Sequence, residues 1–392
     1  MSMDNRAKTK SISFKHKVIR VTTVDLSLER LLEGQLEYLD QYYEVIGIAS
    51  DTGLLEKVGL REHIRVMNVP MKRNISILSD LKCLWILIKI FKKEHPYIVH
   101  TNTPKGSLLS MLAAKITNVP HRIYTITGLR YQGATGLLRI LLKQMERITC
   151  WCANKINPEG EGVKRCLLQD RITSKDLFVI HNGNINGVDT SYYSSLSIKD
   201  TKQEIREKIQ LTNKNFVFVY VGRIVKEKGM RELIYSIKRL KKEYPITKLI
   251  IVGNLEQDLD PLSEEDISFL HQDSCIRYVG YKSDVRPYLK ASDVFVLPSY
   301  REGFPNAVLQ ACAMDVPCIV TDVNGSNEII KNQENGIIIP PKNKTALYEA
   351  MAYCLENTEN LKRLSQMARK KICERYERKD VWSGILNYYN RL

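Results

Sequence analysis

Short runs of β-branched and other apolar residues alternate with helix-length amphipathic segments along almost the whole chain. This alternation is typical of parallel α/β architecture, because strands that alternate with helices build βαβ units. A chain of 392 residues is long enough for two such domains, each with its own core. The sequence therefore predicts an α/β protein with two series of strands and helices.

The elements of each series can be assigned from the pattern. The first series has expected strands at Lys17–Val24, Val45–Ala49, Ile64–Val69, Ile98–Thr101, Arg122–Thr127 and Leu177–Ile180. Its expected helices are Glu29–Gln41, Ser79–Lys93, Gly106–Thr117, Gly136–Ala153 and Gly160–Leu168. The second series has expected strands at Phe216–Val221, Lys248–Val252, Ile276–Val279, Val294–Leu297, Cys318–Thr321 and Gly336–Ile339, and the final segment, Asn357–Leu392, is expected to be helical.

A segment rich in turn-forming residues separates the two series. It reads Asn182-Gly183-Asn184-Ile185-Asn186-Gly187-Val188-Asp189, and such a composition favours a hinge over a strand or helix. We therefore expect one domain over residues 1–185 and a second over residues 186–375. A ligand is expected in the cleft between two Rossmann-like units joined in this way.

Positive charge is concentrated in the first half of the chain. The formal net charge is +15, and residues 1–185 carry 28 Lys and Arg against 17 Asp and Glu. This excess indicates an anionic partner, which could be nucleic acid, an anionic membrane or a phosphorylated substrate. No zinc-finger, RNP-type or basic-heptad pattern accompanies it, so nucleic acid is disfavoured. A solvated basic surface without a partner is the alternative on charge alone.

Composition indicates a soluble globular protein, with 44% hydrophobic and 26% charged residues. The segment Met1–Lys17 lacks an apolar h-region, so we expect no secretory signal. The longest apolar stretches, Leu84–Phe91 and Leu137–Leu142, are each interrupted by a cation and are too short to cross a bilayer. Nine cysteines without metal or disulfide spacing indicate reduced core thiols in a cytosolic protein.

A carboxylate, Glu302, lies in a turn between an apolar run and a helical pattern. The turn reads Pro298-Ser299-Tyr300-Arg301-Glu302-Gly303-Phe304-Pro305-Asn306. In open α/β sheets, ligands bind at this edge, outside the carboxyl ends of the strands. The free N–H groups of a helix N-terminus favour anions, and Pro305 has the fixed φ suited to a first helical turn. An acid for hydroxyl groups beside a cradle for phosphates indicates a sugar nucleotide. A nicotinamide dinucleotide is disfavoured, because no G-x-G-x-x-G follows the first strand.

The second series opens with a strand that ends in Gly222-Arg223, and Lys228 follows at the next helix start. Together with Ala291-Ser292-Asp293, the Glu302-Gly303 turn and the Asn182-Gly183 hinge, this arrangement resembles the retaining glycosyltransferases of family 4, which have the GT-B fold. The match covers most of the chain in the same order. Within that family, the first half is similar to bacterial enzymes that build capsule or O-antigen repeat units, through Gly34-Gln35-Leu36, His100-Thr101-Asn102-Thr103-Pro104-Lys105 and Tyr124-Thr125-Ile126-Thr127-Gly128-Leu129-Arg130.

The resemblance implies two Rossmann-like domains that face each other across a cleft. Residues 186–375 would bind the nucleotide-sugar donor, residues 1–185 would face the acceptor, and the final helix over 376–392 would pack back on the first domain. The implied reaction moves a sugar from a nucleoside diphosphate, UDP, to a saccharide on a polyprenyl diphosphate, with retention of anomeric configuration. No cofactor and no bound metal are expected, because the nucleotide sugar is a substrate.

Arg223, Lys228 and Glu302 are the expected catalytic residues. Two fixed cations can neutralise the diphosphate leaving group as its charge develops in the transition state. By resemblance, Glu302 would hold hydroxyl groups of the transferred sugar. The structural alternatives are that the two cations are surface charges and that Glu302 only complements a helix dipole.

The resemblance also implies a set of donor-binding residues around these three. The set is Gly222, Arg223, Lys228, Glu302, Gly303, Phe304, Pro305, Asn306, Ala307 and Gln310. Gln310 stands where the family pattern has a second glutamate. A neutral amide can still donate to and accept from ribose hydroxyls, so we expect binding to survive this departure.

Four residues of the first half are acceptor-side candidates: Thr103, Lys105, Thr127 and Arg130. Thr127 occupies a turn where many family members have histidine, and Arg130 could supply charge instead. His100 also lies at a strand end, and we interpret it as a buried structural histidine. The motif Asp258-Leu259-Asp260 formally resembles a D-x-D metal site, but it lies in a polar insertion and is expected to be a solvated loop.

Two basic amphipathic segments indicate peripheral contact with the inner face of the cytoplasmic membrane. Arg139, Lys143 and Arg147 recur every four residues opposite a leucine-rich side, and a lysine-rich segment carries Trp85. Such helices can lie on an anionic bilayer, although any helix that covers a sheet has the same pattern. Two other functions stay open: a UDP-sugar epimerase of the same fold, and a non-catalytic module that binds polyanions.

Overall fold

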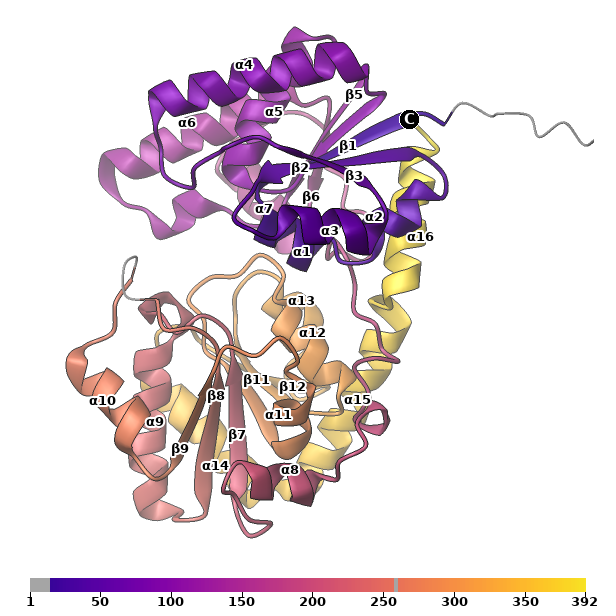
Figure 1. Cartoon of the computed structure of the whole chain (residues 1–392). Coiled ribbons are helices and arrows are strands. Elements are labelled where there is room, and N and C mark those ends of the chain that lie inside the picture. The colour runs from indigo at the N-terminus through magenta and orange to yellow at the C-terminus, as the bar shows by residue number, and fades with distance from the viewer. Residues whose placement is uncertain (1–14, 257–259) are drawn as a thin grey trace, which may run out of the picture. The chain divides into compact units, whose positions relative to one another are not determined.

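Two parallel six-stranded sheets organise the chain, as a computed structural model of residues 15–256 and 260–392 shows (Figure 1). The strands of the first sheet lie in the order β3-β2-β1-β4-β5-β6 and those of the second in the order β12-β11-β10-β7-β8-β9. Both orders are the doubly wound Rossmann order, in which ligands bind where the direction of winding reverses. The predicted fold class of two Rossmann-like sheets with flanking helices is confirmed.

The first series of elements runs to residue 169. Its strands are β1 (Lys17–Val24), β2 (Glu44–Ser50), β3 (Arg65–Asn68), β4 (Ile98–Thr101), β5 (His121–Ile126) and β6 (Lys155–Pro158). Its helices are α1 (Asp25–Leu31), α2 (Gln35–Asp40), α3 (Leu55–Glu62), α4 (Ile77–Glu94), α5 (Pro104–Ile116), the 3₁₀ turn η1 (Arg130–Gly133), α6 (Gly136–Cys152) and α7 (Glu161–Gln169).

The second series begins after residue 194. Its strands are β7 (Phe216–Val221), β8 (Thr247–Val252), β9 (Ile276–Gly280), β10 (Val294–Leu297), β11 (Cys318–Thr321) and β12 (Gly336–Ile339). Its helices are η2 (Ser195–Ser197), α8 (Lys202–Lys208), η3 (Lys226–Lys228), α9 (Met230–Glu243), α10 (Glu264–Gln272), α11 (Arg286–Ala291), α12 (Asn306–Ala313), α13 (Ser326–Ile329), α14 (Lys344–Glu356), α15 (Thr358–Arg375) and α16 (Arg378–Tyr389).

The residues group into two compact units. One holds residues 1–124 and 151–155, and the other holds residues 125–150 and 156–392. The core of the second unit is built on β7 and β10, whose continuous apolar runs are almost fully buried. Such runs are typical of parallel strands that are covered on both faces. The domain boundary at residue 185 and the packing of 376–392 on the first domain stay predictions.

Two of the predicted elements are wrong. Leu177–Ile180 is not a strand, because Leu177 forms only an isolated bridge to Ile156, and the last strand of the first sheet is β6 instead. The helix expected over Glu29–Gln41 is broken at Gly34, whose φ of 75° separates α1 from α2. The final segment is helical as predicted, with a break between α15 and α16.

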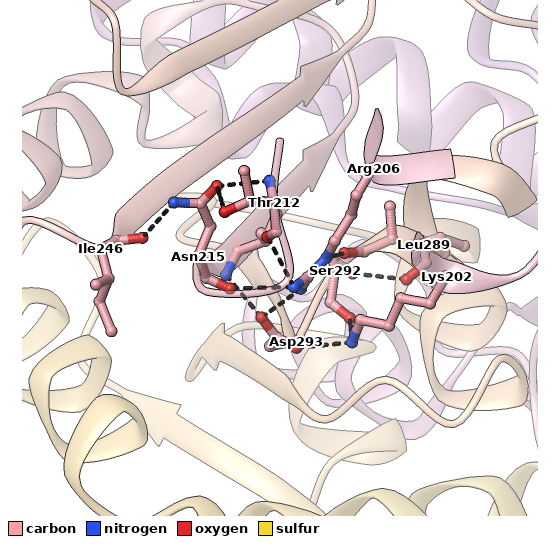
Figure 2. Close-up of polar contacts among 10 residues, drawn as sticks. Lys202, Arg206, Thr212, Asn215, Ile246, Leu289, Ser292 and Asp293 are labelled. Atoms are coloured by element: carbon pink, nitrogen blue, oxygen red, sulfur yellow. Dashed lines mark hydrogen bonds and ion pairs between the residues drawn. The ribbon is translucent and has the colours of Figure 1, made fainter. Parts of the chain in front are cut away.

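Asp293 ties the amino ends of two central strands of the second sheet to α8 (Figure 2). Its Oδ2 accepts hydrogen bonds from the Val217 N–H at 2.7 Å and from Arg206 at 2.8 Å, and its Oδ1 lies 2.7 Å from Lys202 Nζ. Arg206 is buried and also donates to the Ala291 carbonyl at 2.8 Å. The Ala291-Ser292-Asp293 motif therefore stabilises the fold at the edge of the sheet opposite to the ligand-binding edge.

All nine cysteines are free thiols, and seven of them are buried. In the part of the chain that the structure describes, no helix combines the length and the apolar character that a bilayer span requires.

Candidate active site

The turn after β10 carries Glu302 at the carboxyl edge of the second sheet. A side chain on Gly303 would overlap the Thr127 carbonyl oxygen, so only glycine allows the two backbones to approach this closely. α12 begins at Asn306, and Pro305 is its N-cap residue with a φ of −76°. The prediction that Pro305 occupies the first helical turn is therefore wrong by one position, although its fixed φ still shapes the entry to the helix.

Glu302 and Lys228 form an ion pair in this site. Lys228 Nζ lies 2.5 Å from Glu302 Oε1, and the two side chains are only 17% and 10% exposed. Gly229 follows Lys228 with a φ of 74°, and a side chain there would overlap the Pro298 carbonyl. This close approach brings the end of η3 against the start of the turn that holds Glu302. The residues predicted to bind diphosphate and hexose are thus adjacent.

Arg223 is held by two acids just after β7. Its guanidinium lies 3.0 Å from Glu256 and 3.0 Å from Glu227. Glu227 also accepts from Arg301, at 2.6 and 3.1 Å. Burial by itself would raise the pKa of Glu227, but Arg301 and then Arg223 lower it overall. Glu227 is therefore a charged link between the predicted donor cation and the arginine that precedes Glu302.

Glu159 is a buried carboxyl group behind Glu302. It follows β6, and its Oε2 would lie 3.3 Å from a side-chain carbon on Gly303. Burial raises the pKa of Glu159 well above the usual value, a hydrogen bond from the Ile185 N–H opposes the shift, and Glu328 and Glu302 add to it. The charged form of this carboxyl group is therefore disfavoured in the folded protein. The sequence analysis missed Glu159 because it also missed β6.

Glu328, in α13, stabilises the start of α7. Its carboxylate accepts from the N–H groups of Glu161 at 2.7 Å and Gly162 at 2.9 Å. An acid at this position satisfies free N–H groups and complements the helix dipole. Glu328 accepts hydrogen bonds from the backbone just after Glu159. Glu159 is instead a buried carboxyl group, so the two acids have different environments.

The predicted hinge is bound to the donor motif. Asn184 Nδ2 donates to Asn306 Oδ1 at 2.8 Å, and Asn184 Oδ1 accepts from the Asn186 and Gly187 N–H groups. The ring of Phe304 packs beside Gly183. Asn306 and Phe304 therefore support the 183–187 turn within the second unit.

Gln310 and Ala307 lie on α12. Gln310 Nε2 donates to the Tyr193 hydroxyl at 2.9 Å, so the amide that replaces the family's glutamate already has a protein partner. Ala307 packs partly buried against the core. Gly222 follows the last residue of β7, and its N–H donates to the Val252 carbonyl.

The candidates in the first unit have structural partners. Lys105 is buried, lies 2.6 Å from Asp80 and also donates to the Asn74 carbonyl. Thr103 Oγ1 accepts from the Thr23 N–H at 2.7 Å, which holds the start of α5 to the end of β1. Burial, and then Arg20, hold the pKa of His100 well below its usual range, so this histidine is neutral and structural as interpreted.

The D-x-D motif lies only partly within the structure. Asp258 and Leu259 are outside the described residues. The Asp260 carboxylate accepts from the Glu227 N–H at 2.6 Å, which fixes the start of η3 beside the site.

A cavity of about 1110 Å³ opens beside Glu302, and all of its lining residues belong to the second unit. It brings the predicted residues Arg223, Glu302 and Arg130 together, whereas Lys228, Thr127 and Gln310 do not line it. Its walls come from η1, α6, η3, α9 and the segment from Tyr300 to Glu302, and further lining residues are Asp170, Asp260, Val323, Asn324 and Lys342.

Comparisons with known proteins agree with this geometry. Residues 201–371 match the family described as Glycosyl transferases group 1, and residues 30–157 match the one described as Glycosyl transferase 4-like. The chain is 33% identical over 375 residues, 95% of its own length and 97% of the relative's, to the capsular polysaccharide biosynthesis glycosyltransferase CapM of Staphylococcus aureus.

A second relative and a solved structure extend the comparison. The chain is 30% identical over 341 residues, covering 84% of this chain and 85% of the relative, to the UDP-Gal:alpha-D-GlcNAc-diphosphoundecaprenol alpha-1,3-galactosyltransferase of Escherichia coli. It also superimposes on the Anabaena protein Alr3699/HepE, solved in complex with UDP and glucose, with a TM-score of 0.80 at 16% identity over 96% of this chain and all of that one. An identity this low shows a shared fold alone. From the matches along nearly its whole length, the chain belongs to the group 1 glycosyltransferases of the family 4 type, which have the GT-B fold.

Proposed function

We propose that the protein transfers a sugar from UDP, with retention, to a saccharide carried on a polyprenyl diphosphate during synthesis of a bacterial surface polysaccharide. The observation that carries the proposal is the Lys228–Glu302 ion pair at 2.5 Å, with Arg223 on the same cavity as Glu302. The names of the Staphylococcus aureus and Escherichia coli relatives support the pathway class, and the latter also names UDP and a diphosphoundecaprenol acceptor.

The site can perform this reaction by exchanging ion pairs. When a diphosphate arrives, Lys228 and Arg223 have a stronger anionic partner than their present carboxylates, because the diphosphate carries more charge. Glu302 is then released to accept hydrogen bonds from hexose hydroxyls. As the glycosidic bond breaks, negative charge grows on the diphosphate, and the two cations stabilise it most in the transition state.

Retention and metal independence complete the proposal. We infer attack by the acceptor hydroxyl on the face that the diphosphate leaves, with the leaving phosphate taking the proton. Lys228 and Arg223 supply the positive charge that a divalent metal provides in other transferases. Activity should therefore be unchanged by EDTA, and the anomeric coupling constant of the product should match that of the donor.

The outer face of α6 supports contact with a membrane. Leu137 is 85% exposed, and Leu138, Ile140 and Leu141 are also exposed beside Arg139. Apolar side chains next to cations suit the interface of an anionic bilayer. We propose that the protein binds peripherally at the inner face of the cytoplasmic membrane.

Transfer can be tested with purified protein and synthetic substrates. UDP-, GDP- and dTDP-sugars are incubated with a GlcNAc-diphospho-alkyl acceptor, and release of nucleotide and formation of disaccharide are measured. We expect acceptor-dependent release from a UDP-sugar. Conversion of a UDP-sugar without acceptor would instead identify an epimerase.

A polyanion-binding role makes a different prediction for one variant. Glu302→Ala should abolish transfer and the associated polysaccharide in cells, while UDP binding persists. Normal polysaccharide in cells that carry Glu302→Ala would favour the non-catalytic alternative.

A further inference from the structure

The cavity beside Glu302 carries more positive charge than its own acids neutralise. Seven cationic and four acidic residues line it. Each acid is already matched within the protein: Asp170 by Lys143, Glu227 by Arg223 and Arg301, Asp260 by the Glu227 N–H, and Glu302 by Lys228. Burial by itself would raise the pKa of Asp170, but Lys143 and Tyr131, and then Arg139, lower it overall, so Arg139 also acts on this acid.

Five of the lining cations form no ion pair with any residue that the structure describes. They are Arg130, Arg139, Lys226, Arg231 and Lys342. These residues come from η1, α6, η3, α9 and the segment between β12 and α14, so their convergence is not the basic stripe of a single helix. A cavity that holds more cations than acids attracts an anion.

The α6 wall of the cavity is apolar as well as basic. Leu138 and Leu142 line it on either side of Arg139 along the sequence. Leu142 is 8% exposed, whereas Leu137 and Leu141 extend the apolar surface outside the cavity. This arrangement fits a ligand with an anionic head and an apolar tail.

We propose that this cavity binds the diphosphate of the lipid acceptor, with Arg130 and Arg139 as its principal cations. The inference rests on the proposed function. The donor also carries a diphosphate, but of the predicted donor-binding residues only Arg223 and Glu302 line the cavity. The acceptor diphosphate therefore lies next to the donor site, and Glu302 is close to where the two sugars meet.

Comparing two acceptor substrates distinguishes a loss of diphosphate recognition from general damage to the site. One is the GlcNAc-diphospho-alkyl compound, and the other is the same sugar as an uncharged alkyl glycoside. For Arg130→Ala and Arg139→Ala we expect KM for the diphosphate acceptor to rise about tenfold or more, which corresponds to about 1.4 kcal/mol. KM for the alkyl glycoside and KM for the UDP-sugar should not change.

Arg165→Ala is the matched control, because Arg165 is an exposed cation of the same unit that does not line the cavity. It should leave all three KM values unchanged. An equal rise for both acceptors would overturn the proposal, as would no rise. A rise confined to the UDP-sugar would assign the cavity to the donor's diphosphate.

A binding measurement without donor tests the diphosphate site independently of catalysis. Calorimetry with the diphospho-alkyl compound and no donor should give an affinity at least tenfold weaker for the Arg130→Ala/Arg139→Ala double variant than for the unmodified protein. If the unmodified protein transfers no sugar but this difference holds, the proposed function fails and the diphosphate site stands. If transfer occurs but the affinities are equal, the diphosphate site fails alone.

Discussion

Lys228 and Glu302 neutralise each other in their ion pair, but they should contribute to different steps of the reaction. Lys228 is predicted to bind the diphosphate, so Lys228→Ala should lower kcat/KM by about 10²–10³ and weaken binding of UDP itself. Glu302→Gln should lower kcat by a similar factor and leave UDP binding nearly intact, because UDP has no hexose. Steady-state kinetics and calorimetry with UDP test both expectations. Equal loss of UDP affinity in the two variants would contradict this division of roles.

At the same scale, Glu159 should make stability depend on pH. Burial raises its pKa in the folded protein, so the folded state holds a proton that the unfolded state releases once pH exceeds the ordinary carboxyl pKa. Stability must then fall as pH rises from that value towards the folded-state pKa, by about 1.4 kcal/mol per pH unit. Glu159→Gln removes this slope, so it should gain stability relative to the unmodified protein between pH 5 and pH 8. Urea unfolding of both proteins over this range is the measurement, and parallel curves would show that Glu159 is not held neutral.

At the scale of elements, Asp293 should be a determinant of stability and not of catalysis. Asp293→Asn leaves the buried Arg206 without its carboxylate, and the loss of one hydrogen-bond partner in a partly buried pair costs about 1–3 kcal/mol. Lys208→Ala, on the same helix, removes an exposed pair with Asp200 and should cost far less, because water screens a pair of this kind. Urea unfolding measures both costs. UDP affinity of the folded Asp293→Asn variant should be unchanged, and a loss there would place the motif at the ligand-binding edge.

The strands differ in how well the sequence alone predicts them. The sequence predicts β7 and β10 to the residue, because strands buried on both faces form uninterrupted apolar runs. β6 escaped detection because it lies at the edge of its sheet and contains Lys155, Asn157 and Pro158. Because β6 was not predicted, Glu159, which follows it, was not recognised as a site residue. The sequence motifs identify Arg223 as a site residue. They do not predict its ion pair with Glu256, because that pair depends on how two loops pack together in space.

For the whole molecule, charge and exposed apolar surface together predict how membrane binding responds to conditions. The net charge of +15 should make sedimentation with vesicles that contain anionic lipid decline steeply between 0.05 and 0.5 M NaCl, on the order of the range over which surface charges become screened. Leu137→Glu should weaken binding about tenfold or more at low salt, because burial of one leucine is worth about 1.5–3 kcal/mol.

Leu196→Glu is the control for this experiment, because Leu196 is also highly exposed, at 93%, but belongs to η2 and not to α6. It should sediment like the unmodified protein. Equal effects of the two substitutions would show that α6 is not the docking surface.

The internal counter-ions of Arg223 and Lys228 have a consequence for the protein at rest in a cell. Inorganic phosphate is abundant there, and it would bind more tightly to cations that have no partner within the protein. A small anion must compete with carboxylates that are already in place and gains no hexose contact in return. We therefore expect Arg223 and Lys228 to discriminate against inorganic phosphate and to exchange their carboxylates most readily for a molecule that carries sugar and diphosphate together.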